Sequence, residues 1–353
     1  MIKRYFEIIN GVFSNKVWRL NVAVTDNCNS QCIICNVWKN QTKNELTIDD
    51  YCHLFKTFGS ELRWLHITGG EPFLRKDLYE IISCAIESCS KITVIDFATN
   101  GFSVNNVNQT MKKLVQNYPS IFFEAGVSMD GRPHVHESIR NIEGCWEKTQ
   151  NTWSLLRELS LKHDNFKVHI NFTINPWNTG EIRLFLEEFP SLYPISVSLY
   201  HTGSSFNNKL DIVSPDFHKK AKADISWMIH NGKATNIIKK LFLRLALQYL
   251  ENPSKQILHC EAGNSSLFLD PQGNVYLCSI GDYRLGNIRE EPSLQFLNSN
   301  YTKELKNKIH KGLCSCWSGC ECWPSILKHM PAALMKSYGN IIQYNKTENE
   351  TIK

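Results

Sequence analysis

Apolar stretches bounded by turn residues alternate with amphipathic stretches along the first 200 residues of the chain. The apolar stretches are rich in β-branched and aromatic residues, and we expect buried strands at 18–25, 62–68, 92–98, 121–129, 167–174 and 194–199. The stretches between them carry apolar residues at helical spacing, which predicts helices at 76–87, 107–117, 145–162 and 181–189. Alternation of this kind predicts parallel strands joined by right-handed crossovers.

Six strand and helix units are too few to close an eight-stranded barrel. The pattern therefore predicts an α/β fold in the form of a partial, open (β/α)6 barrel. Binding and catalytic residues in such folds lie at the carboxyl ends of the strands. We therefore look for chemistry in the turns that directly follow the predicted strands.

The rest of the chain divides around this barrel. A helical pattern follows it, and later two short strands flank the turn Asp270-Pro-Gln-Gly273, which predicts a hairpin. We expect five segments: an N-terminal arm at 1–17, the barrel at 18–205, a helical linker at 206–257 with helices at 214–231 and 234–250, a small cysteine-rich domain at 258–330 and a C-terminal tail at 331–353.

Net charge, apolar stretches and cysteine count argue against several classes of protein. The 353 residues carry a formal net charge of +5, which is modest and argues against a dedicated nucleic-acid binder. No stretch reaches the roughly 20 apolar residues that span a bilayer, and no secretory signal is apparent. Thirteen cysteines without a signal favour a cytoplasmic protein with metal-ligating cysteines over a disulfide framework. Outside the clusters, we expect four ordinary small buried cysteines: Cys52, Cys84, Cys89 and Cys145.

The first cysteine cluster directly follows the first predicted strand. Cys28, Cys32 and Cys35 can aim three thiolates at one centre from a single loop, and soft thiolates favour zinc or an iron–sulfur cluster. A structural zinc site normally has four protein ligands, whereas no fourth cysteine or histidine follows before Cys52. Three ligands on a four-iron cluster would leave one iron open.

A second motif gives the cysteine triplet its context. The turn Gly69-Gly70-Glu71-Pro72 comes directly after the second predicted strand, and the triplet followed by this turn resembles the radical SAM superfamily. The resemblance implies that the three cysteines bind a [4Fe–4S] cluster and that S-adenosylmethionine chelates the fourth iron. It also implies that the glycine turn contacts the methionyl amino group. Ile34 departs from the aromatic residue that the family usually has before the last cysteine.

Two further strand ends match the same family. Thr99 and Asn100 follow the third strand. In members of the family, residues at this position often line the cofactor pocket, although Asn-Gly is also a common turn. Ser128, Asp130 and Arg140 follow the fourth strand and resemble a segment of members with extra clusters. The resemblance implies that Ser128 bonds the ribose and that Arg140 pairs with the methionyl carboxylate. Asp130 could equally cap the following turn.

Cysteines return in the last third of the chain. Cys260 and Cys278 flank the predicted hairpin, and four more follow: Cys314, Cys316, Cys320 and Cys322. This arrangement resembles the SPASM and Twitch domains of the superfamily, which bind auxiliary [4Fe–4S] clusters. Six cysteines cannot supply eight thiolates, so one auxiliary cluster is expected. We expect Cys260, Cys278, Cys316 and Cys320 as its ligands and Cys314 and Cys322 as spares, a choice that the sequence leaves open. Zinc remains the alternative.

The resemblance implies a radical SAM oxidoreductase or maturase. An external electron donor such as flavodoxin or ferredoxin reduces the cluster, S-adenosylmethionine is cleaved to a 5′-deoxyadenosyl radical, and the radical abstracts hydrogen from a small-molecule or peptide substrate. The arm at 1–17 is short for a leader-peptide domain, which lowers the expectation of a peptide. Residues near strand ends that could contact substrate are Trp177, Tyr200, His201 and the loop at 203–205.

Two other classes of function remain. A nucleic-acid-modifying radical enzyme is opposed by the absence of a basic cluster. A non-catalytic iron–sulfur or zinc protein is opposed by the glycine turn and Arg140, which serve a bound cofactor and have no use in simple electron relay.

Overall fold

The structure is a computed structural model that describes residues 2–40, 42–203, 208, 214–233 and 236–339. Residues 204 and 205 of the predicted substrate loop and most of the tail at 331–353 lie outside the described residues. No helix in the described ranges is long and apolar enough to cross a membrane.

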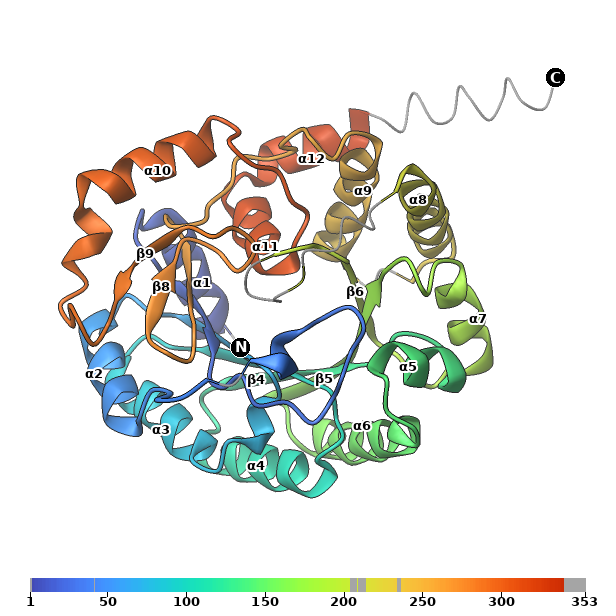
Figure 1. The fold of residues 1–353 in the computed structure, drawn as a ribbon, viewed down its shortest axis with the longest axis horizontal. Coiled ribbons are helices and arrows are strands. Elements are labelled where there is room, and N and C mark those ends of the chain that lie inside the picture. Colours follow the sequence, from blue (N-terminus) through green and yellow to red (C-terminus); the bar gives the residue numbers. More distant parts are fainter. Residues whose placement is uncertain (1, 41, 204–207, 209–213, 234–235, 340–353) are drawn as a thin grey trace.

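Six parallel strands form the barrel wall, in the order of the sequence. They are β1 (Arg19–Ala23), β2 (Trp64–Thr68), β3 (Val94–Thr99), β4 (Phe122–Ser128), β5 (Phe166–Ile174) and β6 (Ile195–Leu199). The helices between them are α2 (Ile48–Phe58), α3 (Leu78–Ser88), α4 (Val104–Asn117), α5 (Pro133–Arg140), α6 (Cys145–Lys162) and α7 (Glu181–Glu188). Figure 1 shows these helices in an arc along one side of the strands. The predicted open α/β barrel is confirmed.

The strands have two different faces. Leu65 and Ile67 of β2 are completely buried in the main hydrophobic core. His66, between them, is half-buried and forms an ion pair with Asp96 of the neighbouring β3, with 2.5 Å between Nδ1 and Oδ2. Alternate residues of a strand point to opposite faces, so the barrel interior is polar while the outer face of the sheet is apolar.

The cysteine-rich segment continues the barrel sheet. The predicted hairpin is confirmed as β7 (Ser266–Leu269) and β8 (Asn274–Tyr276), which pair antiparallel, and β9 (Arg284–Asn287) follows. β7 pairs in parallel with β1, from Arg19 opposite Ser266 to Val22 opposite Leu269. The result is one nine-stranded sheet in the order β6-β5-β4-β3-β2-β1-β7-β8-β9.

Helices pack around the ends of this sheet. α8 (Pro215–His230) and α9 (Ile237–Glu251) lie near the predicted positions, and Asn236 caps α9 by accepting a hydrogen bond from the Lys239 amide at 2.8 Å. Three helices follow the hairpin: α10 (Asn300–His310), α11 (Gly319–Lys328) and α12 (Met330–Gly339). Trp323 of α11 stacks on Phe242 of α9 with 4.8 Å between ring centroids, which fixes α11 against α9.

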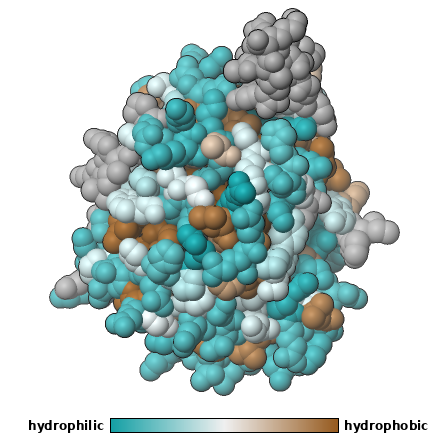
Figure 2. All heavy atoms as spheres, turned by 90° about the vertical axis from the view of Figure 1, so that its right-hand side faces the viewer, coloured by the Kyte–Doolittle hydropathy of each residue, from teal (hydrophilic) through white to brown (hydrophobic). Residues whose placement is uncertain are grey.

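The first 17 residues begin with a helix, α1 (Ile2–Phe13). Four of its large apolar side chains are more than half exposed: Tyr5, Phe6, Ile9 and Phe13. On the side of the molecule seen in Figure 2, hydrophilic residues cover most of the surface and hydrophobic ones appear in smaller patches between them.

Two of the four cysteines outside the clusters are paired, which corrects the expectation from sequence. Cys52 of α2 and Cys84 of α3 form a disulfide, with 5.6 Å between their Cα atoms. These two helices pack side by side, and that contact between distant segments is not encoded in local sequence. Cys89 and Cys145 are buried and unpaired, as predicted.

Candidate active site

The loop that carries Cys28, Cys32 and Cys35 follows β1 and rests on the end of α5. The Gln31 amide donates to the Arg140 carbonyl at 3.2 Å, and the Ile33 amide donates to the Ile139 carbonyl at 2.9 Å. These bonds hold the loop in a curve that brings the three thiols within electrostatic range of one another. Burial raises the pKa of Cys28 to about 11 and that of Cys35 to about 12. Metal ligation there would therefore release protons.

The glycine turn after β2 packs directly on this loop. The Gly70 amide donates to the Thr25 carbonyl at 2.7 Å, and the Glu71 amide donates to the Asn27 carbonyl at 2.8 Å. A Cβ atom on Gly69 would lie 2.3 Å from the Thr25 carbonyl oxygen, and one on Gly70 would lie 2.3 Å from the Asn27 carbonyl oxygen. Only glycine allows this approach of two backbones, and Gly69 also has a φ of +136°.

Glu71 of the same turn points inward and is completely buried. Its carboxylate accepts hydrogen bonds from the Thr99 hydroxyl at 2.8 Å and from the Asn100 amide at 2.7 Å. Burial raises the pKa of Glu71 to about 7, although these hydrogen bonds oppose the shift. Glu71 therefore ties the end of β2 to the end of β3, while Pro72 begins the next short helical turn.

Asn100 extends this connection to the cysteine loop. Its side-chain nitrogen donates to the Asn29 side-chain oxygen at 2.8 Å and lies 3.9 Å from the Cys28 sulfur. Thr99 and Asn100 are almost fully buried at 2% and 6% exposure. Asn100 thus contacts the cysteine loop directly, whereas the Thr99 hydroxyl contacts Glu71.

Asp130 and Arg140 form a buried ion pair beside the second cysteine. Arg140 Nη2 lies 2.5 Å from Asp130 Oδ2, and Arg140 Nη1 lies 3.6 Å from the Cys32 sulfur. Asp130 also accepts a hydrogen bond from the Thr173 amide of β5 at 3.0 Å. Its carboxylate therefore links three elements, which is more than the local turn cap that the sequence also allowed. Ser128 is the last residue of β4 and is half-buried.

These residues suit a cluster with a bound ligand that carries a carboxylate group. Two buried polar atoms next to the loop, Arg140 Nε and His136 Nε2, have no hydrogen-bond partner among the described residues. A guanidinium with a free Nε–H is suited to binding a carboxylate. Over the described ranges, no three His, Cys, Asp or Glu side chains converge tightly enough for a single metal ion. A four-iron cluster binds its cysteines through separate irons, and three thiols around one loop suit it.

The C-terminal cysteines come together between β7, β8 and α11. Cys260 lies within electrostatic range of Cys278 and Cys316, and Cys322 lies within range of Cys260 and Cys316. Burial raises the pKa of the Cys260 and Cys322 thiols well above the usual range. Cys314 sits at the edge of this group, hydrogen bonded to Tyr283.

Cys320 faces a different neighbour. Its thiol hydrogen bonds to His66 of β2, and its carbonyl accepts a hydrogen bond from Arg19 of β1. Burial would raise the pKa of Cys320, but the His66 hydrogen bond and nearby charges outweigh it and lower the pKa. The Cys320 thiol therefore contacts His66 of the barrel while it stays within electrostatic range of Cys316 and Cys322.

The structure also brings in residues that sequence reasoning missed. Asn208 donates to the Ile34 carbonyl of the cysteine loop at 2.9 Å and to the Tyr200 hydroxyl at 3.3 Å. Inside the barrel, a second histidine–carboxylate pair joins His169 of β5 to Glu124 of β4 at 2.9 Å. Period-two polar positions within the predicted strands were the available signal for this polar interior.

Comparison with known proteins gives matches over most of the chain. Residues 22–188 match the family model of the radical SAM superfamily, and residues 260–323 match that of SPASM, an iron–sulfur cluster-binding domain. The AdoMet-dependent heme synthase of Methanosarcina barkeri is 24% identical, over 84% of this chain and 88% of the synthase.

Two further matches cover both parts of the chain. The antilisterial bacteriocin subtilosin biosynthesis protein AlbA of Bacillus subtilis is 24% identical over 80% of this chain, which spans 60% of the length of AlbA. The solved structure of native anSMEcpe with bound AdoMet and Cp18Cys peptide matches with a TM-score of 0.63 and 16% identity, over 95% of this chain and 99% of that chain.

Proposed function

The chain belongs to the radical SAM superfamily and carries a SPASM iron–sulfur domain, and from this premise we propose that it is a maturase that oxidises a peptide. When bound, the two [4Fe–4S] clusters and S-adenosylmethionine supply a 5′-deoxyadenosyl radical for hydrogen abstraction and an auxiliary centre for the oxidation or for substrate binding. The chain's own residues bind, orient and enclose these groups.

Cys28, Cys32 and Cys35 hold the first cluster. Arg140, already next to the Cys32 sulfur, offers its free Nε–H to the methionyl carboxylate, and Asp130 keeps the guanidinium in place. The Gly69-Gly70 turn, packed on the cysteine loop, presents backbone groups to the methionyl amino group. Glu71 acts indirectly, because its hydrogen bonds hold Asn100 against the loop.

The observation that carries the oxidase function is the pairing of β7 with β1. β1, which leads into the cysteine loop, pairs with β7, and β7 pairs with β8, which leads to Cys278, so these three strands lie in one sheet. The Arg19 hydrogen bond to the Cys320 carbonyl adds a second link between barrel and C-terminal segment. An auxiliary centre held at the barrel edge is well placed to exchange an electron with a substrate inside it.

Cys260, Cys278, Cys316 and Cys322 are the proposed ligands of the auxiliary cluster. We expect Cys322→Ser to lower the iron content of anaerobically purified protein by about four atoms per chain, because one thiolate of the cluster is lost. Cys320→Ser, the matched control on the same helix, should keep all of the iron, since Cys320 contacts His66. Iron and sulfide analysis measures both. Loss of four irons from the Cys320 variant alone would instead make Cys320 the ligand.

A peptide is the better-supported class of substrate. The fold of this chain matches, over 95% of its length, that of anSMEcpe, a protein whose structure holds a peptide. An iron porphyrin is the second candidate, because the matched heme synthase aligns over 84% of this chain. Both candidates fit a radical enzyme with an auxiliary cluster.

Deuterium transfer tests the two candidates directly. Reduced protein with S-adenosylmethionine is mixed with tryptic peptides from bacteria grown in deuterated medium, and in parallel with a deuterated iron porphyrin. We expect deuterium in the 5′-deoxyadenosine only with the peptides, since hydrogen is abstracted from the substrate carbon. Mass spectrometry reads the label, and the Cys32→Ala variant should form no 5′-deoxyadenosine. Label from the porphyrin alone would overturn the peptide assignment.

A further inference from the structure

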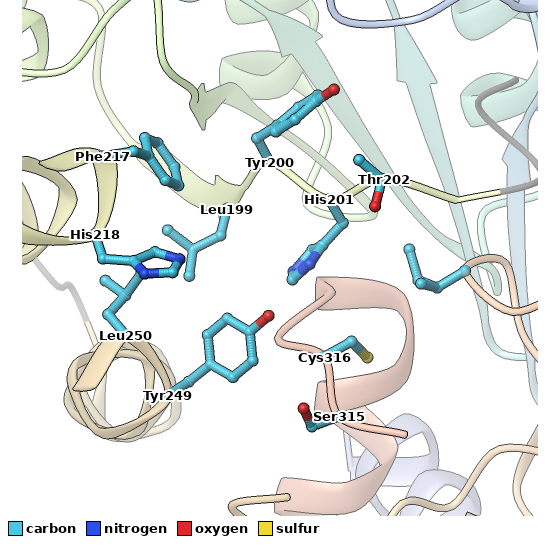
Figure 3. A pocket seen from close by; sticks show the side chains of 11 residues that line it. Leu199, Tyr200, His201, Thr202, Phe217, His218, Tyr249, Leu250, Ser315 and Cys316 are labelled. Carbon is cyan, nitrogen blue, oxygen red and sulfur yellow. The ribbon is translucent and has the colours of Figure 1, made fainter. Parts of the chain in front are cut away.

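A cavity of about 210 Å³ lies between the end of β6, helices α8 and α9, and the loop that precedes α11. It is separate from the cysteine loop after β1. The lining residues are Leu199, Tyr200, His201, Thr202, Phe217, His218, Tyr249, Leu250, Ile280, Ser315 and Cys316. Figure 3 shows the Tyr249 ring and the His201 imidazole pointing into the same space, with Phe217 and His218 on the opposite side.

Among the described residues, the lining combines apolar walls with polar edges and carries no lysine, arginine, aspartate or glutamate. Leu199, Phe217 and Leu250 are buried at 5% exposure or less. His201 is neutral at pH 7, because burial lowers its pKa to about 4. Its Nε2 accepts a hydrogen bond from the Trp317 amide at 3.2 Å, which leaves its proton on Nδ1 as a donor.

This chemistry selects against charged ligands. A carboxylate or ammonium group would lose its water without gaining an oppositely charged partner, which is unfavourable. An aromatic ring would instead meet Tyr249 and Phe217 as ring neighbours, in surroundings where His201 and Tyr249 already pack edge to face at 5.7 Å. The volume is below the roughly 300–1,000 Å³ of pockets for drug-sized ligands, so it suits a single side chain.

The position of the cavity connects it to both cysteine groups. Cys316, which lines it, is a proposed ligand of the auxiliary cluster. The hydroxyl of Tyr200, which also lines it, accepts a hydrogen bond at 3.3 Å from Asn208, and Asn208 donates to the Ile34 carbonyl of the cysteine loop at 2.9 Å. An extended substrate with one side chain in this cavity would therefore run close to the reacting centre without filling it.

We propose that this cavity is an anchor site for an uncharged aromatic side chain, tyrosine or tryptophan, of the peptide substrate. The identity of the ligand as a side chain of a peptide substrate rests on the proposed peptide-modifying function. The binding chemistry of the cavity can be measured without that function.

Calorimetric titration of anaerobically purified protein with 4-methylphenol tests the cavity itself. We expect saturable binding, with at least about tenfold weaker binding of benzoate and benzylammonium, because no lining side chain compensates a charge. His218→Trp should fill the space and weaken 4-methylphenol binding at least about tenfold. Lys219→Trp, on the exposed neighbouring position of α8, should leave it unchanged. Equal binding of benzoate, or binding unaffected by His218→Trp, would overturn the proposal.

The deuterated peptide pool separates this proposal from the proposed function. Sequencing of the peptides that lose deuterium should show tyrosine or tryptophan near the labelled residue at a frequency well above the pool average. His218→Trp should remove that enrichment while S-adenosylmethionine cleavage without peptide continues. Deuterium transfer without aromatic enrichment would overturn the anchor site and leave the peptide function standing. Failure of all transfer would overturn the function, and the titration would still decide the cavity.

Discussion

Cys32→Ala is expected to abolish the formation of 5′-deoxyadenosine and to lower the iron content from about eight to about four atoms per chain. Cys32 lies at the centre of the loop, with its sulfur 3.0 Å from the Ser30 hydroxyl and 3.6 Å from Arg140 Nη1. Anaerobic iron and sulfide analysis, together with chromatography of the cleavage products, measures both effects.

The matched control is Cys89→Ala, which removes a buried thiol that donates to the Phe55 carbonyl far from both cysteine groups. It should keep about eight irons and full cleavage. If the Cys32 variant kept all of its iron, the proposal that Cys28, Cys32 and Cys35 together bind one cluster would be wrong. Zinc in place of the remaining four irons would make the C-terminal centre structural and remove its role in oxidation.

Arg140→Ala is expected to destabilise the fold by about 3–5 kcal/mol, because it leaves Asp130 as a buried carboxylate without its cation. Asp130 is fully buried, and its second oxygen is held by the Thr173 amide, so it cannot turn toward water. The double variant Arg140→Ala/Asp130→Ala should recover much of the loss, since both charges are then absent. Denaturant unfolding of the wild type, both single variants and the double variant gives the coupling between the two residues.

An exposed ion pair provides the control for this measurement. Arg183 and Glu187 of α7 form an i,i+4 pair at 2.8 Å, with side chains 60% and 50% exposed. Arg183→Ala should cost less than about 1 kcal/mol, because water screens such pairs. A loss for Arg140→Ala as small as that for Arg183→Ala would contradict the role of Arg140 as the cation that Asp130 needs in the fold.

The sequence predicted the barrel strands and the cysteine loop because both depend on local patterns. The strand at 62–68, for example, is a largely apolar stretch that ends at a turn whose glycines are needed for close backbone contact. The pairing of β7 with β1 was not predictable in this way. It joins segments that are about 250 residues apart, and no local pattern encodes which edge a hairpin joins.

Local sequence also could not show which C-terminal cysteines bind the auxiliary cluster. Cys320 and Cys322 both lie in α11, where two residues apart means roughly 200° around the helix axis. The two thiols therefore leave the helix in different directions: Cys320 hydrogen bonds to His66, whereas Cys322 lies near Cys260 and Cys316. Spacing along the sequence cannot decide between them until the helix and its facing surfaces are known. The disulfide between Cys52 and Cys84 was missed for the same reason.

The parallel pairing of β1 with β7 also bears on how the chain can be divided. Without the segment after residue 257, β1 would become a sheet edge whose backbone groups from Arg19 to Val22 have no partner. β1 is buried along its whole length. An exposed edge strand of this kind can form backbone hydrogen bonds with a strand of another protein chain. The cysteine-rich segment therefore covers the open edge of the barrel sheet. The two parts form one folding unit, although they match two separate family models.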